Sequence, residues 1–305
     1  PAHPGGVAVH EARAWLETGR RSPALRAGLA LLGLIVLTGA GAPWLALYAP
    51  EATVGPVLAP PGGNFWLGTN GLGQDVLSQL FYACRTSLIV GLCTGLGAAS
   101  LGFLAGAAAG YYPRVAGLVI MRLVDVLMTV PRLPLMILLA VFLGSSLTNV
   151  ILVLVLLSWP GIARTVRSYV LTLRERDYMR YVRFCGGGFG YVLRRHLLPE
   201  LMPLLTAKTI AAASFGIAAE AGLSFLGLGD PTAKSLGTMI RAALDYPGLL
   251  WTPAWTWWFL PPAALVSLAI LAFTLTGYAL EESLYRVKGG AGGESGAAHP
   301  EGQGA

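Results

Sequence analysis

The chain has 305 residues, of which 55% are hydrophobic and only 12% charged, and its formal net charge is +6. A soluble protein normally carries about 25% charged residues, so this composition excludes a soluble globular fold and indicates an integral membrane protein. The apolar runs are continuous rather than alternating, which favours transmembrane helices over a β-barrel. We therefore interpret the basic residues through membrane topology and expect contact with lipid, not with nucleic acid.

Six apolar segments follow one another along the chain, and each is long enough to cross a bilayer. At a rise of ~1.5 Å per residue, about 20 helical residues span the ~30 Å hydrocarbon core. The segments cover residues 27–48, 87–111, 117–143, 147–169, 201–225 and 257–280. The predicted fold class is an all-α integral membrane protein with six transmembrane helices. No clear small-residue cleavage site follows the first segment, so we interpret it as a retained span and not as a signal peptide.

The distribution of Lys and Arg predicts the orientation. With the N-terminus inside, fifteen of these residues fall in inside segments, three fall outside and three lie within spans. This positive-inside bias places both termini in the cytoplasm. The predicted organisation is a cytoplasmic tail (1–26), a first span (27–48), an extracytoplasmic loop (49–86), a transmembrane domain (87–285), and a low-complexity, disordered cytoplasmic tail (286–305).

Charged residues inside the predicted spans are candidates for a translocation path. A charge in mid-membrane costs about 2.5–3.5 kcal/mol on insertion scales, so such residues usually face protein or water. In the third span Arg122 and Asp125 either pair with each other near the cytoplasmic end or lie on a path, and nearby prolines predict a kinked helix. In the fifth span Lys208 and Glu220 share a face, which is either buried against neighbouring helices or lines a path. The candidates are Asp125, Lys208, Glu220 and Ser224.

The sequence shows no site that could supply energy or catalyse a reaction. The nearest approach to a phosphate-binding loop, residues 229–235, lacks the glycine that precedes the lysine. The three cysteines have no metal-ligand spacing and are interpreted as packing residues. His196 beside two arginines is interpreted as structural. We therefore predict no catalytic residue, no metal ligand and no cofactor in this chain.

A basic segment, Arg174 to Pro203, lies between two apolar spans and contains a short amphipathic helix. Its apolar residues recur at helical spacing on one face, and its arginines fall on the other face. The first set is Tyr178, Tyr181, Val182, Cys185 and Phe189, and the second is Arg176, Arg180 and Arg183. A membrane protein without an energy source can receive work from a soluble partner that docks on such a helix.

Three motifs in this sequence resemble those of one transporter family. Residues Asp177 to Gly186, followed by His196 to Pro199, resemble the cytoplasmic EAA loop of ABC-transporter permeases. Glu220 to Gly229, EAGLSFLGLG, looks like the end of the fifth span in the C-type subunits of dipeptide, oligopeptide and nickel importers. Leu67 to Ser78, LGTNGLGQDVLS, is similar to the segment before their second span. The resemblance covers roughly residues 64–286.

The resemblance implies a type I ABC importer fold in the bacterial inner membrane. The chain would be a permease subunit, with di- or oligopeptides as the leading substrates. It would pair with a homologous second permease subunit, two cytoplasmic ATPase subunits that bind ATP and Mg, and an extracytoplasmic binding protein. The coupling loop, residues 174–200, would dock on the ATPase. Its predicted residues are Asp177, Tyr178, Arg180, Tyr181, Val182, Arg183, Cys185, Gly186, His196 and Pro199.

The sequence departs from the family pattern at a few positions. Tyr181 and Val182 replace two alanines of the coupling loop. Leu236 replaces a tryptophan, and an amide stands where the family has an acid or a basic residue at Asn70, Gln74 and Gln79. Alternatives to a peptide importer are the same class carrying nickel, glutathione or another small solute, an ion-coupled secondary transporter in which Asp125 or Glu220 relays ions, and a scaffold or receptor.

Overall fold

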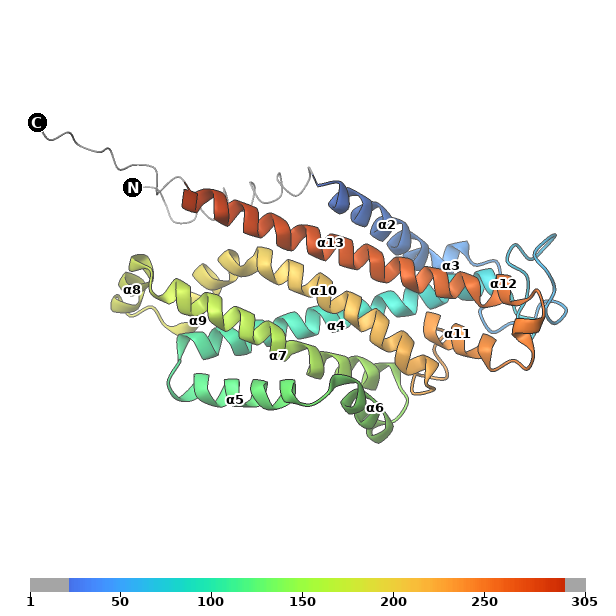
Figure 1. The fold of residues 1–305 in the computed structure, drawn as a ribbon, viewed down its shortest axis with the longest axis horizontal. Coiled ribbons are helices and arrows are strands. Elements are labelled where there is room, and N and C mark those ends of the chain that lie inside the picture. The colour runs from blue at the N-terminus through green and yellow to red at the C-terminus, as the bar shows by residue number, and fades with distance from the viewer. Residues whose placement is uncertain (1–21, 294–305) are drawn as a thin grey trace, which may run out of the picture.

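A computed structural model describes residues 22–293 as a bundle of long helices (Figure 1). These residues form no β-strand, only isolated bridges in the segment between α3 and α4. The elements are α2 (Pro23–Ala40), α3 (Ala42–Leu45), α4 (Val76–Tyr111), α5 (Val115–Thr129), α6 (Arg132–Leu143), α7 (Leu147–Arg174), α8 (Asp177–Phe184), α9 (Phe189–Val192), the π-helix η1 (Leu193–Leu197), α10 (Leu198–Phe225), α11 (Leu236–Leu244), the 3-10 helix η2 (Leu249–Trp251), α12 (Trp255–Trp258) and α13 (Leu260–Gly293).

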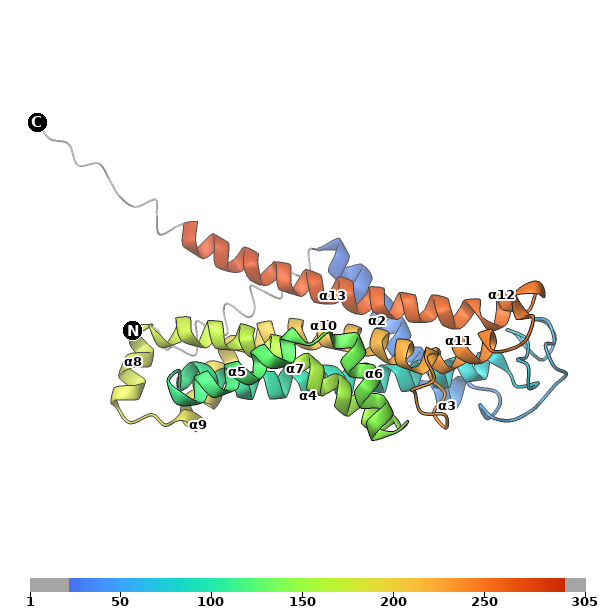
Figure 2. The same cartoon turned by 60° about the horizontal axis from the view of Figure 1, so that its bottom comes forward.

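The predicted all-helical membrane fold is confirmed. Within residues 22–293, five helical stretches are long and apolar enough to cross a membrane, and a bent helix pair can form a sixth span. The five are Pro23–Ala40, Val76–Tyr111, Leu147–Arg174, Phe189–Phe225 and Trp255–Ser283. In both views α8 lies at one end of the bundle, and α11 and α12 lie at the other (Figures 1 and 2). We call these the α8 end and the α11 end.

The third predicted span is broken in the middle, as its prolines predict. Helices α5 and α6 meet at an angle of 95°. Pro131 lacks a backbone N–H, and its ring disfavours the α conformation for the preceding residue. Val130 accordingly has ψ 132°, which ends α5. The chain resumes as α6 at Arg132 in a different direction.

Several boundaries differ from the predicted ones. Helix α4 begins at Val76, where the Asp75 side chain caps it by accepting the Ser78 N–H at 2.8 Å. The helix therefore starts within the predicted extracytoplasmic segment (49–86), because this cap lies outside the apolar segment. The first span is also shorter than predicted, since α2 ends at Ala40. Helix α13 continues to Gly293, so the predicted disorder is wrong for 286–293, whereas 1–21 and 294–305 lie outside the described residues.

Helix α4 is the centre of the bundle, because its glycines allow two helices to approach closely. On one face Gly102, Gly106 and Gly110 pack against α7. A Cβ atom added at Gly106 would lie 2.5 Å from the carbonyl oxygen of Ala163. On another face Gly91 and Gly95 pack against α10. The small-residue spacing of this span therefore reports tight packing, with no room for a side chain at these contacts.

Candidate functional site

At the α8 end, the short helix α8 has one side packed on the bundle. Met179 is only 3% exposed, and Tyr178 and Val182 pack against the same core cluster, which includes Val170 and Leu197. The predicted docking face includes Tyr178 and Val182, which lie half-buried against the bundle, so their part in docking stays a prediction. The bundle offers α8 an apolar surface, and the residues nearest to it turn inward.

The opposite side of α8 is apolar and uncovered within this chain. The side chain of Tyr181 is 71% exposed and that of Phe184 is 91% exposed, and Cys185 is exposed beside them. Phe184 was not among the predicted docking residues, although its place three residues after Tyr181 puts both on one helical face. Arg180 is also exposed, and the side chain of Arg183 lies outside the described residues.

A glycine turn ends α8. Gly186 has φ +82°, a left-handed conformation that L side chains rarely adopt. The N–H of Gly187 then donates to the carbonyl oxygen of Val182 at 2.9 Å, which is the bond of a Schellman motif. The turn and the exposed side chains border an open hollow of about 570 Å³, lined by Tyr181, Val182, Cys185, Gly186, Gly187, Gly188 and Tyr191.

A carboxylate on α10 ties α8 to the bundle. Glu200 accepts a hydrogen bond from the Tyr178 hydroxyl at 2.9 Å and forms an ion pair with Arg176 at 3.1 Å. Burial, together with the charge and hydrogen bond of Glu200, raises the pKa of Tyr178 to about 12, so the hydroxyl stays protonated and donating at neutral pH. The ring of His196 lies 6.0 Å from that of Tyr178. Pro199 lies in the first turn of α10.

The hydrogen bond and the ion pair of Glu200 lead to a prediction about how firmly α8 is held on the bundle. Replacing Glu200 with alanine removes two partners of the segment before and within α8, and we expect the loss of about 1–3 kcal/mol that half-buried, charge-assisted hydrogen bonds contribute. Hydrogen exchange of the α8 backbone amides is expected to be several-fold faster, because α8 then separates from the bundle more often. The matched control is Arg180→Ala, because its ion pair with Glu175 is exposed on both sides and contributes little. Equal exchange rates of the α8 amides in the two variants would show that Glu200 does not hold α8.

Asp125 pairs with Arg164 of α7, not with Arg122, so the prediction of an Arg122–Asp125 pair is wrong. The two residues lie 39 positions apart in sequence and face each other where α5 packs on α7. Both side chains are about half exposed, at 48% and 52%. Nearby at the helix break, the guanidinium of Arg132 lies over the ring of Phe215. Charged groups therefore lie on an uncovered side of the α5–α6–α7 layer.

The other path candidates are engaged with neighbouring helices. Lys208 forms an ion pair with Glu281 of α13 at 2.8 Å. Glu220 is 2% exposed and accepts hydrogen bonds from Ser224 at 2.7 Å and from Ser87 of α4 at 3.3 Å. Lys208 and Glu220 thus have separate partners, and each packs against a neighbouring helix. Their role in a path stays a prediction.

At the α11 end, the structure brings together the three amides that depart from the family pattern. The Asn70 amide nitrogen donates to Gln74 at 2.9 Å and to Gln79 at 3.2 Å, and the Gln79 nitrogen donates to Gln74 at 2.6 Å. All three side chains are buried. One acidic and two basic side chains at these positions would form a charged cluster. In this chain the three amides form an uncharged, hydrogen-bonded cluster in its place.

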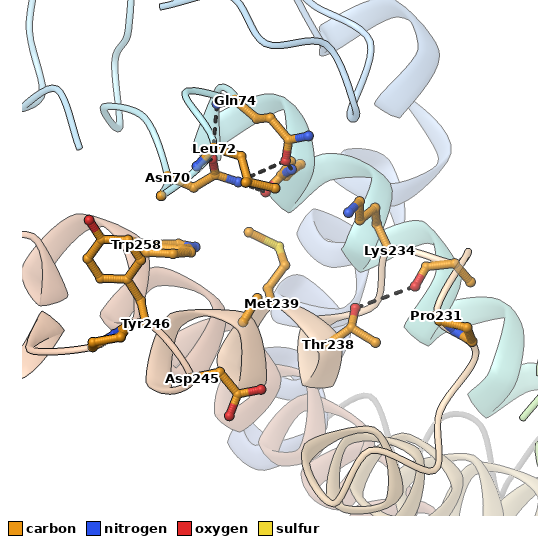
Figure 3. Close-up of a pocket in the computed structure, with 15 residues that line it drawn as sticks. Asn70, Leu72, Gln74, Pro231, Lys234, Thr238, Met239, Asp245, Tyr246 and Trp258 are labelled. Carbon is orange, nitrogen blue, oxygen red and sulfur yellow. Dashed lines mark hydrogen bonds between the residues drawn. The ribbon is translucent and has the colours of Figure 1, made fainter. Parts of the chain in front are cut away.

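These amides border a pocket of about 320 Å³, shown in Figure 3. Its walls come from the segment before α4, from the loop around Lys234, from α11 and from Trp258 of α12. Sequence patterns predict no function for these residues. Their separation in sequence, from Asn70 to Trp258, explains why no local pattern could reveal the pocket.

Comparisons with known proteins point to one family. Residues 102–286 match the family described as binding-protein-dependent transport system inner membrane component. The chain is 36% identical over 241 residues to a putative peptide permease protein of Brucella suis, which covers 79% of each chain. It is 37% identical over 267 residues to a putative peptide transport system permease protein of Brucella melitensis, covering 87% of this chain and 88% of that one. A di/tripeptide transport system permease protein of Pseudomonas aeruginosa is 35% identical over 265 residues, covering 84% and 86%.

Proposed function

Since this chain belongs to the family of inner membrane components of binding-protein-dependent transport systems, we propose that it is the permease subunit of an ATP-driven peptide importer. The names of its relatives support peptides as the substrate class. The chain would form the translocation path with a homologous second permease subunit. Two ATPase subunits would bind ATP and Mg, and an extracytoplasmic binding protein would deliver the peptide.

The observation that carries this proposal is the uncovered apolar side of α8. A helix that exposes Tyr181 and Phe184 at the end of a membrane bundle matches a helix that docks in an apolar groove of a partner. Tyr181, Phe184, Cys185 and Gly186 would form the docking face, with Arg180 and Arg183 at its rim. Asp177, Tyr178, Val182, His196 and Pro199 would hold the segment in place.

The connections of α8 explain how a soluble partner could move the spans. Only two residues separate Arg174, the last residue of α7, from the start of α8, and Glu200 links α8 to α10. Both α7 and α10 pack on α4. Displacement of α8 would therefore rotate two long helices together, because packed helices transmit motion as rigid bodies. In this arrangement the α8 end faces the cytoplasm, in agreement with the positive-inside bias.

We assign the path to the uncovered side of the α5–α6–α7 layer. The break at Val130–Pro131 leaves backbone polar groups without helical partners in the middle of a span, and such groups require protein or water. The half-exposed pair of Asp125 and Arg164 has the same requirement. Of the four path candidates, Asp125 fits this surface. Lys208 instead connects α10 with α13, Glu220 connects it with α4, and Ser224 bonds to Glu220 within α10.

Uptake into vesicles that contain the complete complex tests the proposed function. We expect uptake of a dipeptide only with ATP and the binding protein present, and no change when an ionophore dissipates ion gradients. Uptake that survives ATP depletion and stops with the ion gradient would establish an ion-coupled transporter instead. Import that is intact after deletion of the chain would leave it a scaffold. A binding protein that retains nickel or glutathione would change the substrate but not the class.

A further inference from the structure

The pocket at the α11 end has the size and the walls of a small-molecule site. Its volume of about 320 Å³ falls in the range of about 300–1,000 Å³ that is typical of ligand pockets. Met239 and Trp258 are buried, and the Tyr246 ring meets Trp258 edge to face at 5.6 Å. In Figure 3 this aromatic pair and Lys234 lie on opposite sides of Met239.

The loop before α4 packs closely on the apolar wall of this pocket. A Cβ atom at Gly71 would lie 2.7 Å from the Tyr246 ring and 2.9 Å from the Trp258 ring, so the loop backbone rests directly on both aromatic rings. Leu72 is a further apolar residue of the lining. This wall would accept an apolar group.

Among the charged and amide side chains of the lining, Lys234 alone has no hydrogen-bond or ion-pair partner in the described part of the chain. The amides of Asn70, Gln74 and Gln79 bond to one another, and the last two also donate to backbone carbonyls at 3.0 and 2.8 Å. The Asp245 carboxylate accepts the Nε–H of Arg241 at 3.1 Å. None of these four side chains needs a ligand.

Lys234 is partly buried in the lining and has no ion pair or hydrogen bond to any described residue. The adjacent helix terminus does not attract an anion in its place, because Ser235 and Thr238 cap α11 reciprocally. One uncommitted ammonium group beside an apolar wall matches a single carboxylate. It does not match a phosphate, which usually takes several donors.

We propose that this pocket binds the terminal carboxylate of a short peptide whose last residue is apolar. The Lys234 ammonium would pair with the carboxylate, and the wall of Met239, Tyr246 and Trp258 would receive the apolar side chain. This inference rests on the proposed function and places a peptide-binding step at the entrance of the permease.

Binding of two dipeptides to the complete complex tests the proposal. The complex is held in lipid nanodiscs without nucleotide and without the binding protein, and alanyl-leucine and alanyl-leucinamide are titrated by calorimetry. The amide lacks the terminal charge, so we expect the acid to bind about tenfold more tightly or better, as one charge-assisted hydrogen bond implies. In Lys234→Gln this preference should vanish, and Lys234→Arg should restore it.

Equal binding of acid and amide by the unmodified complex would overturn the proposal, and so would a Lys234→Gln complex that keeps the preference. A Lys234→Gln effect on the affinity for the binding protein, with peptide titrations unchanged, would also overturn it and make the pocket a protein-docking site. The comparison of the two dipeptides needs no variant and therefore does not depend on the variant's assembly. Failure of the proposed function is separate, since it would appear as absent ATP-dependent uptake by the unmodified complex.

Discussion

Replacing Gly186 with valine is expected to disconnect ATP hydrolysis from transport. Gly186 has φ +82°, and a β-branched residue there is strained by about 1–3 kcal/mol. The turn would relax by breaking the bond from Gly187 to Val182 and by moving Phe184 and Cys185 away from their present positions. Since one or two kcal/mol changes a population by a factor of about 5–30, peptide uptake should fall at least about fivefold. Vesicle uptake and ATP hydrolysis are measured on the same preparation.

The control is Gly188→Val in the same loop. Gly188 has φ −69° and ψ 165°, an extended conformation that valine adopts readily, and a Cβ atom there would meet nothing within 4 Å. We expect nearly unchanged coupling. Comparable losses in the two variants would mean that bulk in the loop matters and that the left-handed turn does not.

Replacing Gly106 with valine is expected to prevent assembly of a stable bundle. A Cβ atom there would lie 2.5 Å from the Ala163 carbonyl oxygen and 2.8 Å from the Val166 Cβ, and backbone atoms cannot yield as a flexible side chain can. Helices α4 and α7 would have to separate. Overpacking of this kind costs about 1–3 kcal/mol, and lost contacts along the helix pair add to it. The amount of detergent-purified complex and its thermal midpoint measure the effect.

Gly33→Val in α2 is the matched control, because a Cβ atom at Gly33 would meet nothing within 4 Å. Both substitutions place the same residue in an apolar transmembrane helix, so they share any change in helix propensity and in insertion. We expect normal yield for Gly33→Val. A yield of Gly106→Val equal to that of Gly33→Val would contradict the close α4–α7 contact.

The features that the sequence predicts well are those that the bilayer or the backbone imposes. Spans need long apolar helices, Pro131 removes a hydrogen-bond donor in mid-span, and Gly186 allows a left-handed turn. Each of these constraints acts within a few residues. They could therefore be read without knowing which helices are neighbours in space.

The features that the sequence does not predict depend on distant neighbours. Amphipathic spacing groups Tyr178 with Tyr181, but the bundle buries Met179 and leaves Phe184 in the open, because only the packed helices decide which side is covered. Asp125 likewise has a nearby arginine in sequence, yet its partner is Arg164 of another helix. The amide cluster is intermediate, since its members lie close in sequence and depart together from the family pattern.

Photo-crosslinking from two aromatic positions tests most directly the central claim that α8 docks on the ATPase. A photoreactive phenylalanine analogue replaces either Phe184 at the α8 end or Trp251 at the α11 end, whose side chains are 91% and 93% exposed. In the complete complex we predict an adduct with an ATPase subunit from position 184 and none from position 251. An adduct with the ATPase from position 251, with none from position 184, would contradict both the docking face and the orientation of the chain.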